Sequence, residues 1–192
     1  MRCLMMVLFF ALGIPLLAQD VQNRSVMHVM LDINDHWFIP FWSITDIKTQ
    51  NPNATNLFAG IGYRGKTWWV EGLTQKQWNQ AGGFWSADVR FRKQTGRVSL
   101  FLEPRVIVVP SLAFYEYVSV EERLWKGLAL RQETENVHRQ GKDSIAIGGG
   151  LGYNLGKWRG FDVATALVYR VGLTGKDEVR VYVSITRRIK FR

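Results

Sequence analysis

Residues 178–191 alternate between apolar and polar side chains, and this pattern constrains the fold more than any other feature of the chain. Apart from Arg187, the odd positions carry valine, isoleucine or phenylalanine, whereas the even positions carry charged residues, tyrosine, serine or threonine. Successive side chains of a β-strand point to opposite faces. The segment is therefore predicted to be a strand with one apolar and one polar face.

The same period of two recurs along most of the chain. Strongly patterned segments lie at 84–92, 97–108, 128–135, 144–155 and 161–171, and weaker candidates lie at 36–47, 56–65, 67–74 and 111–122. Glycine and polar residues fall between these segments, as they do in the connections of antiparallel hairpins. The sequence therefore predicts an all-β fold in which antiparallel strands follow one another in an up-and-down barrel.

The N-terminal residues 1–18 have the pattern of a secretory signal peptide. Arg2 precedes an apolar run from Leu4 to Leu17, which is shorter than the roughly 20 residues of a membrane-spanning helix. We expect cleavage after Ala18, with a retained signal anchor as the alternative. Because the single cysteine, Cys3, lies in this segment, no disulfide framework is expected in the remainder.

The net charge of +9 and the isoelectric point near 9.9 raise nucleic acid as a partner. The basic residues do not gather in a tail or on one helical face. Many of them, such as Arg90, Arg105 and Arg180, stand at alternate strand positions opposite apolar residues. We therefore expect no nucleic-acid partner.

Together, the export signal and the alternating final strand that ends on Phe191 resemble small bacterial outer-membrane β-barrel proteins, the OmpA/OmpX-like class. The resemblance implies apolar side chains facing lipid and polar side chains facing a lumen. It also implies a location in the outer membrane of a Gram-negative bacterium, in contact with membrane lipid and lipopolysaccharide. Segment 178–191 would then be the signal that the barrel-assembly machinery recognises.

The number of strands follows from parity, because bacterial barrels of this type have an even number of strands and both chain ends in the periplasm. Alternation in 27–33 would bring the count to eleven. We therefore assign 19–35 to an N-terminal periplasmic segment and predict ten strands in a barrel domain spanning 36–192, with eight or twelve as alternatives. Exterior connections are then expected at 48–55, 74–83, 109–110, 138–142 and 173–177.

Charges of both signs share the predicted inward faces and are expected to pair across the lumen. These residues are Asp88, Arg90, Arg92, Glu103, Arg105, Arg131, Glu133, Glu135, Asp162, Arg170, Glu178 and Arg180. In so narrow a barrel long side chains leave little space, so we expect a mostly closed interior and a structural or binding role at the cell surface. A narrow channel for small solutes is the alternative. Inward glycines at 148, 150 and 152 are expected to make room for a large neighbour such as Arg131 or Arg170.

Tryptophans near the strand ends are expected to form an aromatic girdle, since indole prefers the bilayer interface. The predicted members are Trp37, Trp68, Trp69, Trp85, Trp125 and Trp158.

Catalytic and metal-binding signals are weak. His138, Ser144 and Glu135 supply a base, a hydroxyl and a carboxylate, the groups needed for acyl transfer to or from lipid A, but no motif of such an enzyme is matched. The histidines are isolated, so no metal and no cofactor are expected. A soluble periplasmic barrel of lipocalin type would alternate equally well, with its apolar residues inward and its charges outward.

Overall fold

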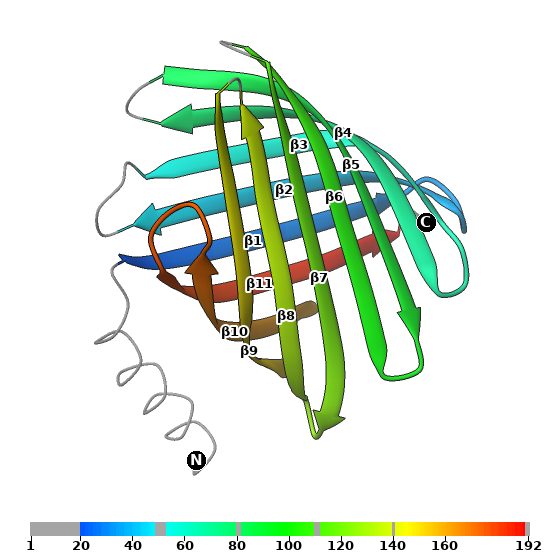
Figure 1. The fold of residues 1–192 in the computed structure, drawn as a ribbon. Helices are drawn as coiled ribbons and strands as arrows, with labels where there is room; N and C mark the ends of the chain where they lie inside the picture. Colours follow the sequence, from blue (N-terminus) through cyan, green and yellow to red (C-terminus); the bar gives the residue numbers. More distant parts are fainter. Residues whose placement is uncertain (1–19, 49–52, 80–81, 110–111, 140, 191–192) are drawn as a thin grey trace.

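The computed structural model describes residues 20–48, 53–79, 82–109, 112–139 and 141–190. Within these ranges, eleven strands form one closed barrel (Figure 1). The strands are β1 (Asp20–Asp32), β2 (Trp37–Lys48), β3 (Ala54–Arg64), β4 (Trp68–Asn79), β5 (Gly82–Thr95), β6 (Val98–Val109), β7 (Ala113–Trp125), β8 (Leu128–Arg139), β9 (Lys142–Trp158), β10 (Phe161–Gly172) and β11 (Glu178–Lys190). Consecutive strands pair antiparallel, which confirms the predicted all-β barrel of sequential hairpins.

The predicted count of ten strands was wrong, and so was the assignment of 19–35 to a segment outside the barrel. β1 pairs antiparallel with β2 and parallel with β11, with Asp20 opposite Glu178 and Asp32 opposite Lys190. The barrel is therefore antiparallel except at this one seam, and the start of β1 and the end of β11 lie at opposite rims of the barrel (Figure 1). The alternation of β1 is weak, because some of its outward residues are polar and some of its inward residues are apolar. The expectation of an even number of strands therefore excluded this segment from the predicted barrel.

The two longest connections between strands, 49–53 and 173–177, lie at the same rim of the barrel. We call the rim where β2, β4, β6, β8 and β10 end the loop end, and the opposite rim the turn end. At the turn end, Lys126 and Gly127 have φ of 38° and 88°, and Arg159 and Gly160 have φ of 48° and 84°. Positive φ at both central residues defines the type I′ turn, whose twist matches that of paired strands.

The strands that flank all five predicted exterior connections meet at the loop end, although residues 49–52, 80–81, 110–111 and 140 lie outside the described ranges. The segment 74–83 is not a long loop. β4 continues to Asn79 and β5 begins at Gly82. The end of β4 carries mostly polar residues on both faces, including Gln75, Lys76 and Gln77. An apolar–polar alternation therefore does not reveal it as a strand.

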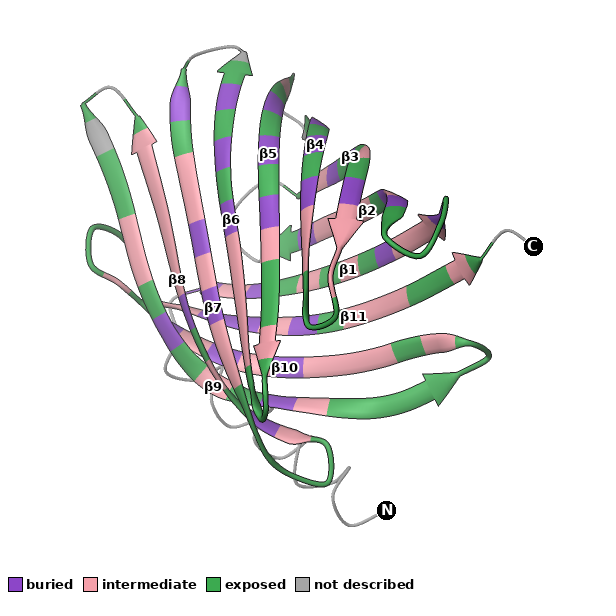
Figure 2. Ribbon diagram, turned by 90° about the vertical axis from the view of Figure 1, so that its right-hand side faces the viewer, coloured by how far each residue is buried: buried purple, intermediate pink, exposed green. Residues whose placement is uncertain are grey.

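Buried and exposed residues alternate along many of the strands (Figure 2), and the two faces of the sheet have opposite chemistry. Buried polar and charged residues, such as Gln75, Arg90 and Arg180, point into the barrel. Large apolar residues point outward and are exposed on the barrel wall. These include Met27, Phe41, Ile47, Leu57, Ile61, Val89, Val106, Leu130, Ile147, Leu151, Val171 and Val183. Apolar residues thus face outward and charged residues face inward, the reverse of a lipocalin-type barrel.

Gly150 shows how closely two strands approach where β9 pairs with β10. A Cβ atom added to Gly150 would lie well inside van der Waals contact with the Leu167 carbonyl group, and 2.7 Å from the Cα atom of Val168. We expect Gly150→Ala to lower the free energy of unfolding by about 1–3 kcal/mol, because the backbone has to shift. Gly149→Ala is the matched control, since a Cβ there meets open space. Urea titration of both variants checks the prediction, and equal midpoints would contradict it.

Candidate functional site

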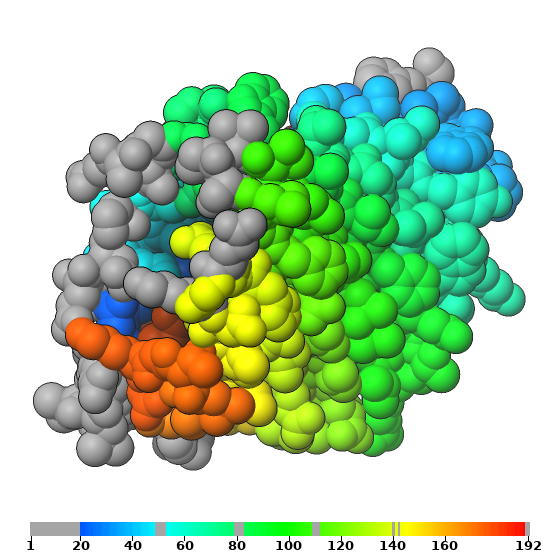
Figure 3. Space-filling view, turned by 45° about the horizontal axis from the view of Figure 1, so that its top comes forward, coloured from blue at the N-terminus to red at the C-terminus, as the bar shows by residue number. Residues whose placement is uncertain are grey.

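The interior of the barrel holds a cavity of about 2080 Å³. Its lining includes Lys48 and Arg139 from the loop end, and Lys126 and Asn154 from the turn end. Figure 3 shows the hollow between the orange and yellow strands, with blue N-terminal residues visible inside it. We expected long side chains to fill and close the interior. Instead, ion pairs lie along the walls and leave this space, because eleven tilted strands enclose a wider lumen than the side chains fill.

One ion cluster lies on β5 and β6. The side chain of Arg90 is fully buried, and its Nη2 atom lies 3.0 Å from Asp88 Oδ2 and 3.3 Å from Glu103 Oε1. Arg105 also pairs with Glu103, and it stands directly opposite Asp88 in the β5–β6 register. Residues two apart on a strand share a face, so alternation places both charges of each strand on the inner face, and the β5–β6 register brings the two pairs together.

Aromatic rings enclose the Arg90 cluster from the opposite side. The Arg90 guanidinium lies 4.0 Å from the ring centroid of Phe58 and 4.4 Å from that of Trp42. Trp42 stacks on His28 with centroids 3.6 Å apart, and its Nε1 donates a hydrogen bond of 2.7 Å to Glu71. His28, Trp42 and Glu71 were missed as lumen residues. The weak alternation of β1, β2 and β4 was the only signal that could have found them.

A second cluster centres on Glu133 of β8, whose side chain is fully buried. Its carboxylate accepts hydrogen bonds from the hydroxyl groups of Tyr117 (2.8 Å) and Tyr182 (2.7 Å), and from Arg131 Nε (3.2 Å). Arg170 and Arg180 lie 3.3 Å and 3.5 Å from the other carboxylate oxygen. A single carboxylate thus connects strands that lie on both sides of β9.

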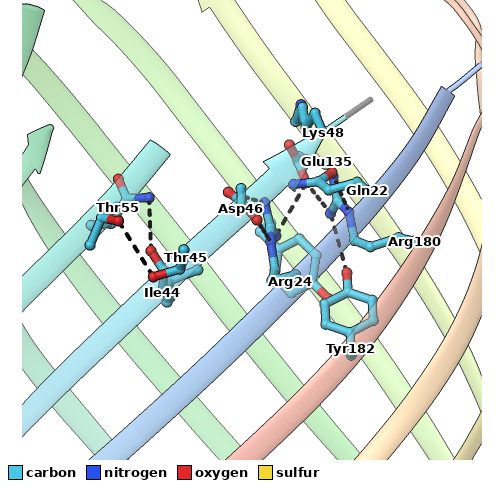
Figure 4. Close-up of polar contacts among 12 residues, drawn as sticks. Gln22, Arg24, Ile44, Thr45, Asp46, Lys48, Thr55, Glu135, Arg180 and Tyr182 are labelled. Atoms are coloured by element: carbon cyan, nitrogen blue, oxygen red, sulfur yellow. Dashed lines mark hydrogen bonds and ion pairs between the residues drawn. The ribbon is translucent and has the colours of Figure 1, made fainter. Parts of the chain in front are cut away.

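The Glu133 cluster continues toward the loop end through Arg180 and Glu135, which Figure 4 shows beside Arg24. Arg180 lies 2.7 Å from Glu135, and Arg24 of β1 pairs with Asp46 at 2.6 Å. Arg170 and Arg180 also share Glu178. β9 leaves room for these contacts, as expected from its inward glycines, because a Cβ on residue 148 would lie 2.7 Å from Cγ of Arg170.

Ten of the twelve predicted lumen charges thus enter ion pairs along the wall. The other two, Arg92 and Asp162, line the cavity without an ion pair to any described residue. Arg92 donates from Nε to the hydroxyl oxygen of Ser99 at 3.0 Å.

Among the predicted girdle residues, Trp37, Trp68, Trp85, Trp125 and Trp158 are exposed near the strand ends. Trp69 was wrongly included. It follows Trp68 on β4 and therefore points inward, where it packs against Phe101 with centroids 6.0 Å apart. Cations accompany three of the exposed rings: Lys76 at Trp85, Lys126 at Trp125 and Arg159 at Trp158.

The predicted acyl-transfer constellation is not assembled. His138 points outward, where its ring stacks on Phe114 and its Nδ1 lies 3.4 Å from Asp143. Ser144 lines the cavity, and Glu135 faces inward to bind Arg180. His138 and Glu135 are three residues apart on one strand, so the sheet wall separates them.

The described ranges contain no group of three or more histidine, cysteine, aspartate or glutamate residues that could hold a metal ion. They also contain no helix long and apolar enough to cross a membrane. In the comparisons with known proteins, no protein family, no curated protein and no solved structure matched the chain. The function proposed below is therefore inferred from the arrangement of the lumen and the outer wall.

Proposed function

We propose that this protein is a β-barrel of the outer membrane of a Gram-negative bacterium, with its outward face in lipid and its charged lumen in contact with water. The distribution of side chains between the two faces carries this proposal. Val89, Leu151 and Val183 are 44–48% exposed on the outer wall, whereas Arg90 and Arg180 are buried inside. A closed barrel satisfies all backbone hydrogen bonds, which lipid requires of any spanning structure.

The energetic argument follows from the extent of the apolar wall. Exposed apolar residues occur on every strand from β1 to β11. Burial of apolar surface is favourable by about 25 cal/mol per Å², and monomeric soluble proteins rarely expose contiguous apolar patches beyond a few hundred Å². A lipid bilayer would cover such an apolar wall around the whole circumference of the barrel.

The orientation follows from the connections. Short turns are typical of the periplasmic side of such barrels, so the turn end, where β11 ends, is assigned to the periplasm and the loop end to the lipopolysaccharide side. β1 then begins on the lipopolysaccharide side, and in this the eleven-stranded barrel departs from even-numbered barrels, which have both chain ends in the periplasm. Segment 178–191, of which 178–190 form β11, is then the signal for the barrel-assembly machinery. The proposed signal peptide, 1–18, lies outside the described residues.

Heat-modifiability tests the proposal. The chain is expressed with its N-terminal segment in a Gram-negative host, and gel mobility of the outer-membrane fraction is compared with and without boiling. A folded membrane barrel resists detergent until it is boiled, so we expect two mobilities in that fraction. Recovery of the protein in the soluble periplasmic fraction with one mobility would refute the proposal.

A second function, a narrow passage for small polar solutes, is favoured by the cavity that has lining residues from both rims. Lys48 and Arg139 line it at the loop end, and Lys126 and Asn154 at the turn end. Planar-bilayer recordings of the purified barrel are expected to show stepwise conductance in potassium chloride. Inserted, heat-modifiable protein without conductance steps would instead assign the lumen a structural or binding role.

A further inference from the structure

One part of the lumen wall carries more positive than negative charge. It is formed by Arg92 on β5, Ser99 on β6, Arg123 and Glu121 on β7, and Arg131 on β8, and we call it the Arg92 wall. All five residues line the cavity. The four strands are consecutive neighbours in the barrel, so the residues form one continuous surface near the turn end.

The strand register holds the residues of the Arg92 wall side by side. Ser99 stands opposite Glu121 in the β6–β7 pair, and Glu121 stands opposite Arg131 in the β7–β8 pair. Arg123 follows Glu121 by two residues and therefore shares its face. Arg92 reaches this surface through its 3.0 Å hydrogen bond to Ser99. The charge of Glu121 favours the charged form of Arg92, and the charges of Arg131 and Arg123 oppose it.

The charges in the Arg92 wall do not balance. Glu121 is its one carboxylate, and Arg131 occupies it at 2.8 Å. The chain has sixteen acidic side chains, all within the described ranges, and none lies within ion-pair distance of Arg92 or Arg123. Elsewhere in the lumen, the buried residues Arg90 and Arg180 have at least two carboxylate contacts each. The Arg92 wall therefore carries positive charge that no described carboxylate compensates.

We propose that the Arg92 wall binds a small oxyanion, either phosphate or a soluble solute that bears a phosphate group. Guanidinium groups present parallel N–H donors that match phosphate oxygens. Arg92 and Arg123 supply such donors, and the Ser99 hydroxyl keeps its proton for donation, because its oxygen accepts from Arg92. Low-dielectric walls focus the positive field into the cavity. The site rests on the proposed function, since the solute reaches it through a water-filled lumen.

Equilibrium dialysis with radiolabelled inorganic phosphate tests the site, using the heat-modifiable, detergent-solubilised barrel at constant ionic strength. The variants are Arg92→Gln and Arg123→Gln. Arg139→Gln is the matched control, because Arg139 also lines the cavity without an ion pair to a described residue, but at the loop end. We expect saturable binding by the unmodified protein. Each Arg92 wall variant should weaken it about tenfold, equivalent to about 1.4 kcal/mol, and Arg139→Gln should change it less than twofold.

Two results would overturn the inference. The first is the absence of saturable phosphate binding by a protein whose mobility shift shows that it is folded, which would leave the arginines merely solvated. The second is an equal loss of binding in Arg139→Gln, which would indicate a diffuse positive field. Both results leave the membrane barrel intact. Failure of the barrel proposal would appear separately, as a soluble protein without a mobility shift.

Discussion

Replacement of Val183 by arginine is expected to lower the free energy of unfolding of the membrane-inserted barrel by about 2–4 kcal/mol, because an arginine at the bilayer midplane has to be accommodated in hydrocarbon. Val183 is 45% exposed on the outer wall. It pairs with Thr165 and Ser25 near the middle of β10 and β1. The side chain at this position therefore lies far from both rims, and an arginine there is least able to reach water by snorkelling.

Leu155→Arg is the control for position along the barrel. Leu155 is also exposed on the outer wall, at 51%, but it lies near the turn end of β9. The same substitution there should cost only about 0–1 kcal/mol. Urea titration of both variants in lipid vesicles, followed by tryptophan fluorescence, measures the difference. If the wall faced water, both arginines would be ordinary surface substitutions within about 0.5 kcal/mol, and equal midpoints would contradict lipid exposure.

Those predictions depend on which residues share a face, and the alternation of the sequence alone predicted that. Which face points outward stayed open in the sequence, because a lipocalin-type barrel alternates equally well. Tyr182 and Val183 occupy opposite faces in the structure, one buried and the other 45% exposed, because side chains alternate along any strand. The same rule places Asp88 and Arg90 together. The alternation of side chains could also have shown that His138 and Glu135 lie on opposite faces of the sheet. It could likewise have shown that Trp69 does not share the outward face of Trp68.

What sequence reasoning missed depends on contacts between distant segments. β1 joins β11 through a parallel pair whose partners are about 158 residues apart, as in Gln22 and Arg180. No local pattern encodes such a pairing. Likewise, the contact of Glu133 with Tyr182 depends on how far β8 and β11 curve toward each other. The width of the lumen follows from strand number and stagger together, so a wrong strand number also gave a lumen that was too full.

Replacement of Glu133 by alanine is expected to lower the free energy of unfolding by about 3–5 kcal/mol, the cost of breaking a buried ion pair from one side. The substitution removes the acceptor of two tyrosine hydroxyl groups and of Arg131 Nε. It also removes the charge that lies 3.3 Å from Arg170 and 3.5 Å from Arg180. Arg170 and Arg180 keep their ion pairs with Glu135 and Glu178. However, without the negative charge of Glu133 the electrostatic repulsion between the two arginines is larger.

Two further variants separate the causes of that loss. Glu133→Gln keeps the shape and part of the hydrogen bonding while removing the charge, so its effect should lie between those of alanine and the unmodified chain. Glu122→Ala removes an exposed carboxylate on the neighbouring strand, β7, and should change stability by less than about 0.5 kcal/mol. Urea midpoints in lipid vesicles rank the three variants. A Glu133→Ala midpoint equal to that of Glu122→Ala would show that the barrel wall, rather than the charge network inside it, determines stability.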